Sequence, residues 1–154
     1  MAIKGFRHSG IVVKDMEKSM QFYCKMLNHK VIVDFIEEGK YFEDLIGISN
    51  ARARVVKAGL PDKTFVELIQ FLNIDYYEKS FLGFNFRGCN HICFNDDDIE
   101  TTYSSLVENG VNFITPPLAS EFDPVKTCFC RDPDGTLVQF VEVTDVENIQ
   151  PGLE

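Results

Sequence analysis

A weak internal repeat is the feature of this sequence that most constrains its fold. The segment HSGIVVKDMEKSMQFY begins at His8, and the segment HICFNDDDIETTYSSL begins at His91. A single offset superposes the two histidines and also superposes Asp15 on Asp98. A repeat of this kind decides how the whole fold is interpreted. We expect two similar modules, each opening with a strand that carries a histidine.

The last strands of the two modules also match. TFVELIQF begins at Thr64 and TLVQFVEV begins at Thr136, and superposing them places Glu67 on Gln139. Strand alternation puts Glu67 on one face with three apolar residues, Phe65, Ile69 and Phe71. A carboxylate with such neighbours is costly to ionise without a cation, a metal ion or a hydrogen-bond donor. Glu67 therefore requires a partner.

The repeated positions supply four candidate metal ligands, which are His8, Glu67, His91 and Gln139. Two imidazoles, one carboxylate and one amide oxygen suit a divalent ion such as Zn²⁺, Ni²⁺, Co²⁺, Mn²⁺ or Fe²⁺. The alternative is that both histidines are neutral core residues and that Glu67 pairs with Arg52 or Arg54. Because the two histidines occupy equivalent positions, and Glu67 and Gln139 do so as well, metal binding is favoured, with one divalent ion of unspecified identity per site.

Length and composition are typical of a globular enzyme or binding protein. At 154 residues the chain is long enough for a single domain, which we expect to consist of modules at about 5–72 and 88–144. The sequence contains no run of about 18 apolar residues and no secretory signal at its start, so we expect no membrane span and a cytoplasmic location.

The net charge of −9 argues against a nucleic-acid partner, because such partners require clustered basic residues. The candidates for a local basic cluster are Lys4, Arg7, Arg52, Arg54 and Lys57. A solvated surface is the favoured interpretation of these side chains.

The five cysteines include no C-x-x-C pair, which favours a reducing compartment over a disulfide framework. Alternation puts Cys89, His91 and Cys93 on one strand face, and Cys128 and Cys130 also share a face, so a zinc–thiolate site is an alternative. Core packing is the favoured role for these thiols.

The hydrophobic periodicity predicts an α+β fold of two β-α-β-β-β modules. In the first module we expect helices at 16–27 and 40–47 and strands at 6–13, 31–36, 51–58 and 64–71. In the second we expect a helix at 99–109, a loop at 118–124 and strands at 90–94, 111–115, 125–130 and 136–143. Asp15 and Asp98 are predicted N-caps of the helices that follow them.

These segments resemble the vicinal oxygen chelate superfamily, which includes glyoxalase I, methylmalonyl-CoA epimerase, extradiol dioxygenases and the fosfomycin and bleomycin resistance proteins. The resemblance is carried by HSGIVVKDMEKSMQFYCKML, VELIQF, NHICFNDDD and RDPDGTLVQFVE. It implies paired modules that form a curved, half-barrel-like mixed sheet with a metal-binding cleft. The implied ligands are His8, Glu67, His91 and Gln139, and relatives are often homodimers.

One position departs from the family pattern. The family usually has glutamate seven residues after the first aspartate of D-P-D-G, and counted from Asp132 that residue is Gln139. An amide in place of a carboxylate removes one negative charge, which weakens metal affinity and removes one candidate base. Glu67 is then the remaining candidate general base.

The resemblance implies a divalent-metal-dependent lyase or isomerase of glyoxalase or epimerase type, acting on a small carbonyl or thioester substrate. In this mechanism the metal stabilises an enolate, and Glu67 leaves the metal to move a proton on the adjacent carbon. One alternative is an iron-dependent dioxygenase using two histidines and Glu67. Another is a metal-free, resistance-type binding protein whose pocket is lined by the aromatic residues of segment 73–88.

Overall fold

The computed structural model describes residues 5–77, 84–85 and 88–147, which form parts of two compact units, Met1–Ser80 and Phe81–Glu154. Each unit contains one four-stranded mixed sheet, so the expected α+β class is confirmed. The single-domain organisation and the metal-binding cleft stay predictions. Lys4, Phe81 and Phe86 lie outside the described residues.

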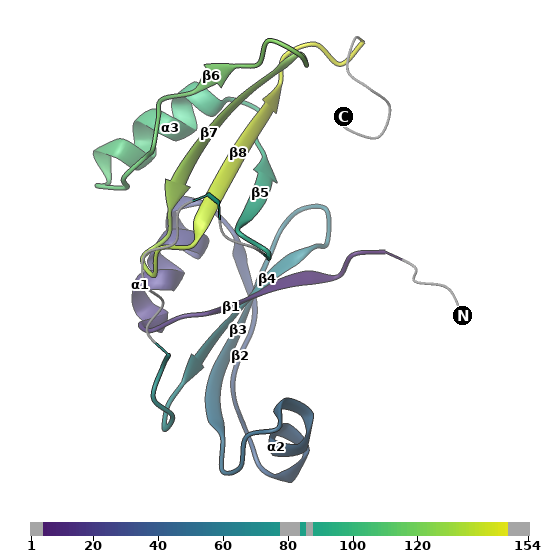
Figure 1. The fold of residues 1–154 in the computed structure, drawn as a ribbon, viewed down its shortest axis with the longest axis vertical. Helices are drawn as coiled ribbons and strands as arrows, with labels where there is room; N and C mark the ends of the chain where they lie inside the picture. The colour runs from purple at the N-terminus through teal and green to yellow at the C-terminus, as the bar shows by residue number, and fades with distance from the viewer. Residues whose placement is uncertain (1–4, 78–83, 86–87, 148–154) are drawn as a thin grey trace. The chain divides into compact units, whose positions relative to one another are not determined.

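The sheet of the first unit has the strand order β1-β4-β3-β2 (Figure 1). Its strands are β1 (His8–Val12), β2 (Lys30–Glu38), β3 (Arg52–Gly59) and β4 (Phe65–Phe71). The first and last strands of the unit, β1 and β4, are parallel neighbours, while the other two pairings are antiparallel. The two strands predicted to carry His8 and Glu67 are therefore adjacent.

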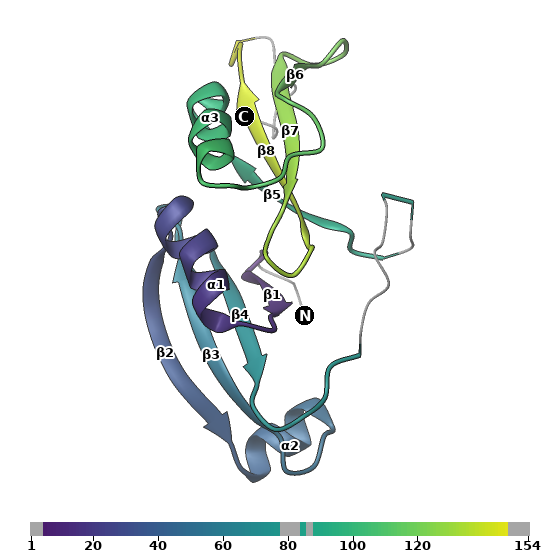
Figure 2. The ribbon, with the colours of Figure 1, turned by 90° about the vertical axis from the view of Figure 1, so that its left-hand side faces the viewer.

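Helix α1 (Met16–Met20) lies against one face of this sheet, as Figure 2 shows. Asp15 caps it as predicted, because its carboxylate accepts hydrogen bonds from the backbone N–H groups of Glu17 and Lys18 at 3.1 and 3.2 Å. The expected α-helix over 16–27 is wrong beyond Met20, where the chain continues as a π-helix, η1 (Gln21–Met26).

The wider turns of the π-helix bring two neighbouring aromatic residues into the core. The N–H of Leu27 donates to the carbonyl of Phe22, five residues back, at 3.0 Å. Phe22 and Tyr23 are both buried, with their rings edge to face at 4.9 Å. The spacing of the apolar residues predicts a helix here but does not distinguish an α-helix from a π-helix, which explains the difference from the expected helix.

Helix α2 (Lys40–Ile46) agrees with the expected helix and ends at Gly47, which has a left-handed φ of 71°. It buries Phe42 against a small apolar cluster that contains Ala53 and Val55 of β3, with Ile69 and Phe71 of β4 packed beside it. α2 therefore covers part of the sheet face on which Glu67 lies.

In the second unit the strand order is β5-β8-β7-β6, which reproduces the order of the first. Its strands are β5 (His91–Asn95), β6 (Leu118–Ala119), β7 (Val125–Arg131) and β8 (Leu137–Val143), and helix α3 is Ile99–Glu108. Asp98 caps α3 by accepting from the N–H of Thr101 at 3.1 Å, and Gly110 follows the helix with a φ of 82°. Both features agree with the sequence pattern.

The strand expected at 111–115 is wrong. Only Phe113 forms a bridge there, to Cys130 of β7, and the N–H of Ile114 donates to the Phe129 carbonyl at 2.8 Å. Pro116 and Pro117 interrupt the pairing because proline cannot donate to a strand ladder. Pairing resumes in the two-residue strand β6, within the segment expected to be a loop.

The two sheets have the same register, which confirms the repeat at the level of strand pairing. In the first unit His8 lies opposite Phe65, and in the second His91 lies opposite Leu137. Two residues further along, Gly10 lies opposite Glu67 and Cys93 lies opposite Gln139. Each histidine strand therefore runs beside the strand that carries the matching carboxylate or amide.

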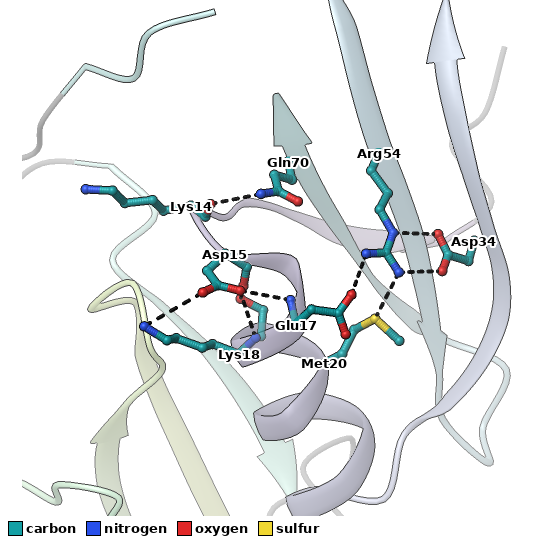
Figure 3. Close-up of polar contacts among 9 residues, drawn as sticks. Lys14, Asp15, Glu17, Lys18, Met20, Asp34, Arg54 and Gln70 are labelled. Atoms are coloured by element: carbon teal, nitrogen blue, oxygen red, sulfur yellow. Dashed lines mark hydrogen bonds and ion pairs between the residues drawn. The ribbon is translucent and has the colours of Figure 1, made fainter. Parts of the chain in front are cut away.

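The repeat extends to the ion pairs that join the helices to the third strands. Arg54 of β3 contacts Glu17 of α1 at 2.6 Å and binds Asp34 of β2 through two hydrogen bonds, at 2.9 and 2.7 Å (Figure 3). At the equivalent positions of the second unit, Lys126 contacts Glu100 at 3.0 Å. The arginine cluster is the more extensive of the two, because it joins three elements.

β2 is one edge strand of the first sheet and β6 is the corresponding edge strand of the second, and they differ in length. β2 has nine residues, most of them exposed, and among the described strands it pairs only with β3. Five of its apolar side chains are more than a third exposed: Val31, Ile32, Val33, Phe35 and Ile36.

In the described part of the chain, no helix is both long enough and apolar enough to cross a membrane.

We predict that Arg54→Met lowers the free energy of unfolding by about 1–2 kcal/mol, because the substitution removes several charge-assisted hydrogen bonds at once. Lys126→Met is the matched control, since it removes the equivalent single ion pair. Urea denaturation of both variants measures the difference. An equal loss in the two variants would contradict the special role of the arginine cluster.

We also predict acid sensitivity from Asp34, whose pKa is lowered mainly by its hydrogen bonds from Arg54. Because the folded-state pKa lies below the unfolded-state value, this contribution is full above about pH 4 and disappears as the pH falls through the folded-state pKa. Asp34→Asn should flatten the loss of stability between about pH 4 and pH 2. In an Arg54→Met background the same substitution should have no such effect.

Candidate metal-binding site

The first unit brings His8 and Glu67 together on neighbouring strands. The Nε2 atom of His8 lies 3.8 Å from Oε1 of Glu67, whose side chain is 19% exposed. This distance is too long for a hydrogen bond. It is close to the spacing of about 3.0–3.4 Å expected for two donors that each lie about 2.1 Å from one ion. The pair therefore offers one nitrogen and one oxygen donor to a shared position.

The second carboxylate oxygen of Glu67 has a different partner, Lys57 of β3. Its Nζ atom lies 3.3 Å from Oε2. The alternative that Glu67 pairs with Arg52 or Arg54 is wrong, because Arg52 contacts Glu38 at 2.7 Å and Arg54 belongs to the cluster described above. Strand register explains this choice, since Lys57 lies directly opposite Glu67 in the β3–β4 pair.

From the sequence Lys57 is expected only as a surface basic residue, although the sequence contains a signal that places it opposite Glu67. The turn GLPDK joins two strands, and the pairing of Gly59 with Phe65 across this turn puts Lys57 opposite Glu67. Residues directly opposite each other in antiparallel strands have adjacent side chains. Counting outward from the turn thus identifies the cation that accompanies the carboxylate.

The imidazole of His8 is not held as an ordinary hydrogen-bonded core histidine. Its ring stacks on Phe65 at 4.8 Å, and its Nδ1 atom is buried with no hydrogen-bond partner in the described residues. Leaving a buried polar atom unpaired has a free-energy cost. The interpretation of His8 as a satisfied core residue is therefore not supported by its contacts.

In the second unit His91 lies on β5 and is exposed. Its Nδ1 atom lies 2.5 Å from Oδ1 of Asn90, and its ring meets Phe129 edge to face at 5.5 Å. An amide oxygen only accepts hydrogen bonds, so Nδ1 is the donor in the Asn90 contact, and Nε2 is the ring nitrogen that faces away from it. A hydrogen bond to the far nitrogen is also what orients histidine ligands in metal sites.

Gln139 lies on β8 with its amide nitrogen engaged. Nε2 donates to the hydroxyl of Thr127 at 2.9 Å, and that hydroxyl in turn donates to the Phe140 carbonyl at 3.0 Å. Because its nitrogen is engaged, the amide is oriented so that its oxygen is the atom available to bind a metal ion. The polar residues of β8 are Gln139 and Glu142, and Gln139 occupies the position equivalent to Glu67.

Glu142, the carboxylate nearest to Gln139 in the sequence, has another role. Its Oε2 atom accepts from the N–H of Ile99 at 2.9 Å, at the start of α3. At the equivalent place in the first unit, the Gln70 amide donates to the Lys14 carbonyl at 3.0 Å, as Figure 3 shows. The carboxylate and the amide have thus exchanged positions between the two units. Glu142 is committed to the strand–helix corner and cannot replace Gln139.

Two of the cysteines, Cys128 and Cys130, have the packing role that the sequence favours, whereas Cys89 and Cys93 are exposed. Cys128 and Cys130 are buried, and burial raises the pKa of each thiol to about 12. All five cysteines are free thiols. Within residues 5–77, 84–85 and 88–147, no group of three or more His, Cys, Asp or Glu side chains is assembled, so a zinc–thiolate site is not found there.

The aromatic segment 73–88 is described only in part. Tyr76 donates to the Phe71 carbonyl at 2.9 Å, and Phe84 packs edge to face on Phe129 at 4.8 Å. Tyr77 is fully exposed. Tyr76 and Phe84 therefore each have a contact of their own, and a pocket lined by this segment stays a prediction.

Each β-α-β-β-β unit pairs its first strand in parallel with its last, so that the histidine strand runs beside the strand carrying Glu67 or Gln139, and this arrangement defines a class of paired-module α+β proteins. The family model described as Glyoxalase/Bleomycin resistance protein/Dioxygenase superfamily matches residues 5–140. The chain belongs to this superfamily, also known as the vicinal oxygen chelate superfamily, and the resemblance inferred from the sequence is confirmed.

Two relatives are lactoylglutathione lyases. The chain is 27% identical over 151 residues to the Pseudomonas aeruginosa protein, covering 90% of this chain and 82% of that one. It is 25% identical over 160 residues to the Schizosaccharomyces pombe protein, covering 96% of this chain but only 50% of the relative. These similarities support a function within the glyoxalase superfamily.

Solved structures show the same fold. A glyoxalase family protein from Bacillus cereus aligns with a TM-score of 0.82 and 17% identity, covering 92% of this chain and 95% of that one. A fosfomycin resistance protein from Listeria monocytogenes, in complex with Mn(II) and sulfate, aligns with a TM-score of 0.59 and 17% identity, covering 96% and 98% of the two chains.

Proposed function

We propose that this chain is a divalent-metal-dependent lyase of the glyoxalase type that acts on a small carbonyl substrate. The observation that carries the proposal is the His8–Glu67 pair, with nitrogen and oxygen donors 3.8 Å apart at the position implied by the family resemblance. The names of the relatives favour a hemithioacetal substrate over an acyl-CoA thioester. The proposal extends to a cytoplasmic homodimer.

The proposed ligand set consists of His8, Glu67, His91 and Gln139, with one divalent ion per site. Its donor chemistry suits Zn²⁺, Ni²⁺, Co²⁺, Mn²⁺ or Fe²⁺, because imidazole and carboxamide or carboxylate oxygens bind all of these ions. The bound ion would supply Lewis acidity that polarises a carbonyl group. Asn90 and Thr127 support the set by orienting His91 and Gln139.

Glu67 is the proposed general base. Its carboxylate has apolar neighbours on the strand face, is only 19% exposed, and has a counter-charge on Lys57 at 3.3 Å. A carboxylate in this setting can take a proton from a carbon next to a carbonyl and return it to the neighbouring carbon. Gln139 cannot share this work, because a carboxamide is not a base at neutral pH.

A metal-free, small-molecule-binding function is the second candidate. The Lys57–Glu67 ion pair favours it, because Glu67 has a compensating charge without a metal ion. Metal content separates the two functions, and iron with oxygen uptake would favour the dioxygenase alternative.

We predict near-stoichiometric metal in protein purified without an affinity tag, and its loss from His8→Ala and Glu67→Ala variants. Gln70→Ala is the matched control, because Gln70 lies on the same strand as Glu67 but on the opposite face. Elemental analysis makes the comparison. Absence of metal after incubation with Ni²⁺, Zn²⁺, Mn²⁺ and Fe²⁺ would instead support the binding-protein candidate.

Activity is tested with the hemithioacetal of methylglyoxal and glutathione. Removing a general base costs on the order of 10²–10⁴-fold in rate, so Glu67→Gln should lose at least a hundredfold in kcat. If Glu67→Gln retained both metal and activity, its assignment as the base would be wrong.

Gln139 provides a separate prediction about metal affinity. Gln139→Glu adds a negative charge to the proposed ligand set and should tighten the binding of Ni²⁺ by at least about tenfold, because ligand charge strongly affects ion affinity. Gln70→Glu adds the same charge on the opposite face of β4 and should change the affinity far less. Competition with a chromophoric chelator measures both, and equal effects would argue against Gln139 as a ligand.

A further inference from the structure

The two carboxylate oxygens of Glu67 have different neighbours. Oε1 is directed toward the imidazole of His8, while Oε2 is directed toward the ammonium group of Lys57. The two partners come from the strands on either side of β4, since β1 and β3 both pair with it. A single carboxylate is thus shared between a proposed metal-binding histidine and a permanent cation of the protein.

Lys57 is held beside Glu67 by more than the ion pair. Its Nζ atom lies 5.6 Å from the centre of the Phe65 ring, within the range of a cation–π contact, and Phe65 also stacks on His8. The lysine side chain is only 31% exposed. The four side chains His8, Phe65, Glu67 and Lys57 therefore form one contiguous group on a single face of the sheet.

The second unit lacks this arrangement at equivalent positions. Phe129 lies opposite Gln139 in the β7–β8 pair, as Lys57 lies opposite Glu67 in the β3–β4 pair. A cation accompanies the carboxylate in one unit, and an apolar ring accompanies the neutral amide in the other. When Lys57 is counted with the four proposed ligands and both histidines are neutral, the set carries no net charge.

We propose that Lys57 is a positioning residue that competes with the divalent ion for Glu67, an inference that rests on the proposed function. It holds Oε2, which leaves Oε1 as the carboxylate oxygen that would bind an ion. Its positive charge also opposes the approach of a second cation, which weakens ion binding. The same contact gives Glu67 an alternative partner when it leaves the ion to take up a proton.

The test compares wild-type protein with Lys57→Met, Lys57→Arg and the matched control Lys126→Met. Lys126 is a partly exposed lysine of the other sheet, 35% exposed, that pairs with Glu100 at 3.0 Å and contacts none of the proposed ligands through that pair. Lys126→Met changes the net charge of the protein by the same amount as Lys57→Met does. Affinities for Ni²⁺ alone and Mn²⁺ alone are measured on metal-free protein by competition with a fluorescent chelator.

We expect Lys57→Met to bind both ions about tenfold or more tightly than wild type, as expected from removing a unit charge a few ångströms from a dication in a partly screened site. Lys57→Arg should stay within about threefold of wild type, because the charge is kept. Lys126→Met should stay within about twofold, because its charge is screened by solvent.

Thermal denaturation supplies a readout that a purely structural ion pair would not give. In metal-free protein, Lys57→Met should lower Tm by about 2 °C, because Glu67 loses its partner. On addition of Ni²⁺ the same variant should gain more in Tm than wild type does. A lysine that only stabilises the fold would lower Tm without increasing the gain from metal.

The outcomes separate the inference from the function on which it rests. Unchanged or weaker ion binding in Lys57→Met, while His8→Ala abolishes binding in wild type, would overturn the role of Lys57 and leave the metal site intact. Equal tightening in Lys126→Met would also overturn it, by assigning the effect to net charge. If Lys57→Met bound Ni²⁺ or Mn²⁺ while the wild-type protein bound neither, the result would support competition between Lys57 and the ion for Glu67. Failure of both proteins to bind either ion would overturn the metal site and the inference together.

Discussion

The parallel pairing of the first strand of each unit with its last strand is the constraint on which the rest of the structure depends. It places β1 beside β4 and β5 beside β8, although more than forty residues separate the members of each pair. Because the two pairs share one register, each histidine strand runs beside the strand that carries Glu67 or Gln139, and in the first unit this brings His8 within 3.8 Å of Glu67. The same pairing requires a helix to cross between the first and second strands, and the aspartate caps start these helices at equivalent positions.

The contacts around this framework are equivalent in position but different in chemistry. Arg54 and Lys126 both join the third strand of a unit to its helix, yet only Arg54 also binds the second strand. Gln70 and Glu142 both brace the strand–helix corner, one as a donor and the other as an acceptor. Duplicated positions have thus kept their geometry while their charges diverged. This divergence leaves Glu67 as the carboxylate of the candidate ligand set.

Sequence patterns predicted most of the fold because strand alternation, helix caps and glycine termini are local properties. They identified the repeat, both aspartate caps and the end of α2 at Gly47. They failed where tertiary packing overrides periodicity, as in the π-helix that buries both Phe22 and Tyr23. They failed again at 111–115, where two prolines interrupt pairing. The alternative that paired Glu67 with Arg52 or Arg54 named the wrong cation, because strand register, which places Lys57 opposite Glu67, was not used to choose among the basic residues.

The long edge strand β2 has a consequence for how the chain is made. The first unit is complete while roughly seventy residues of the second remain to be synthesised. At about 5–20 residues per second, that interval lasts several seconds. During this time β2 presents an unpaired backbone edge with apolar side chains, which favours association with other chains. In the second unit the edge strand that corresponds to β2 is β6, which has only two residues and therefore presents less unpaired backbone. Synthesis in this order therefore exposes the long apolar edge of β2 for several seconds before the second unit has been made.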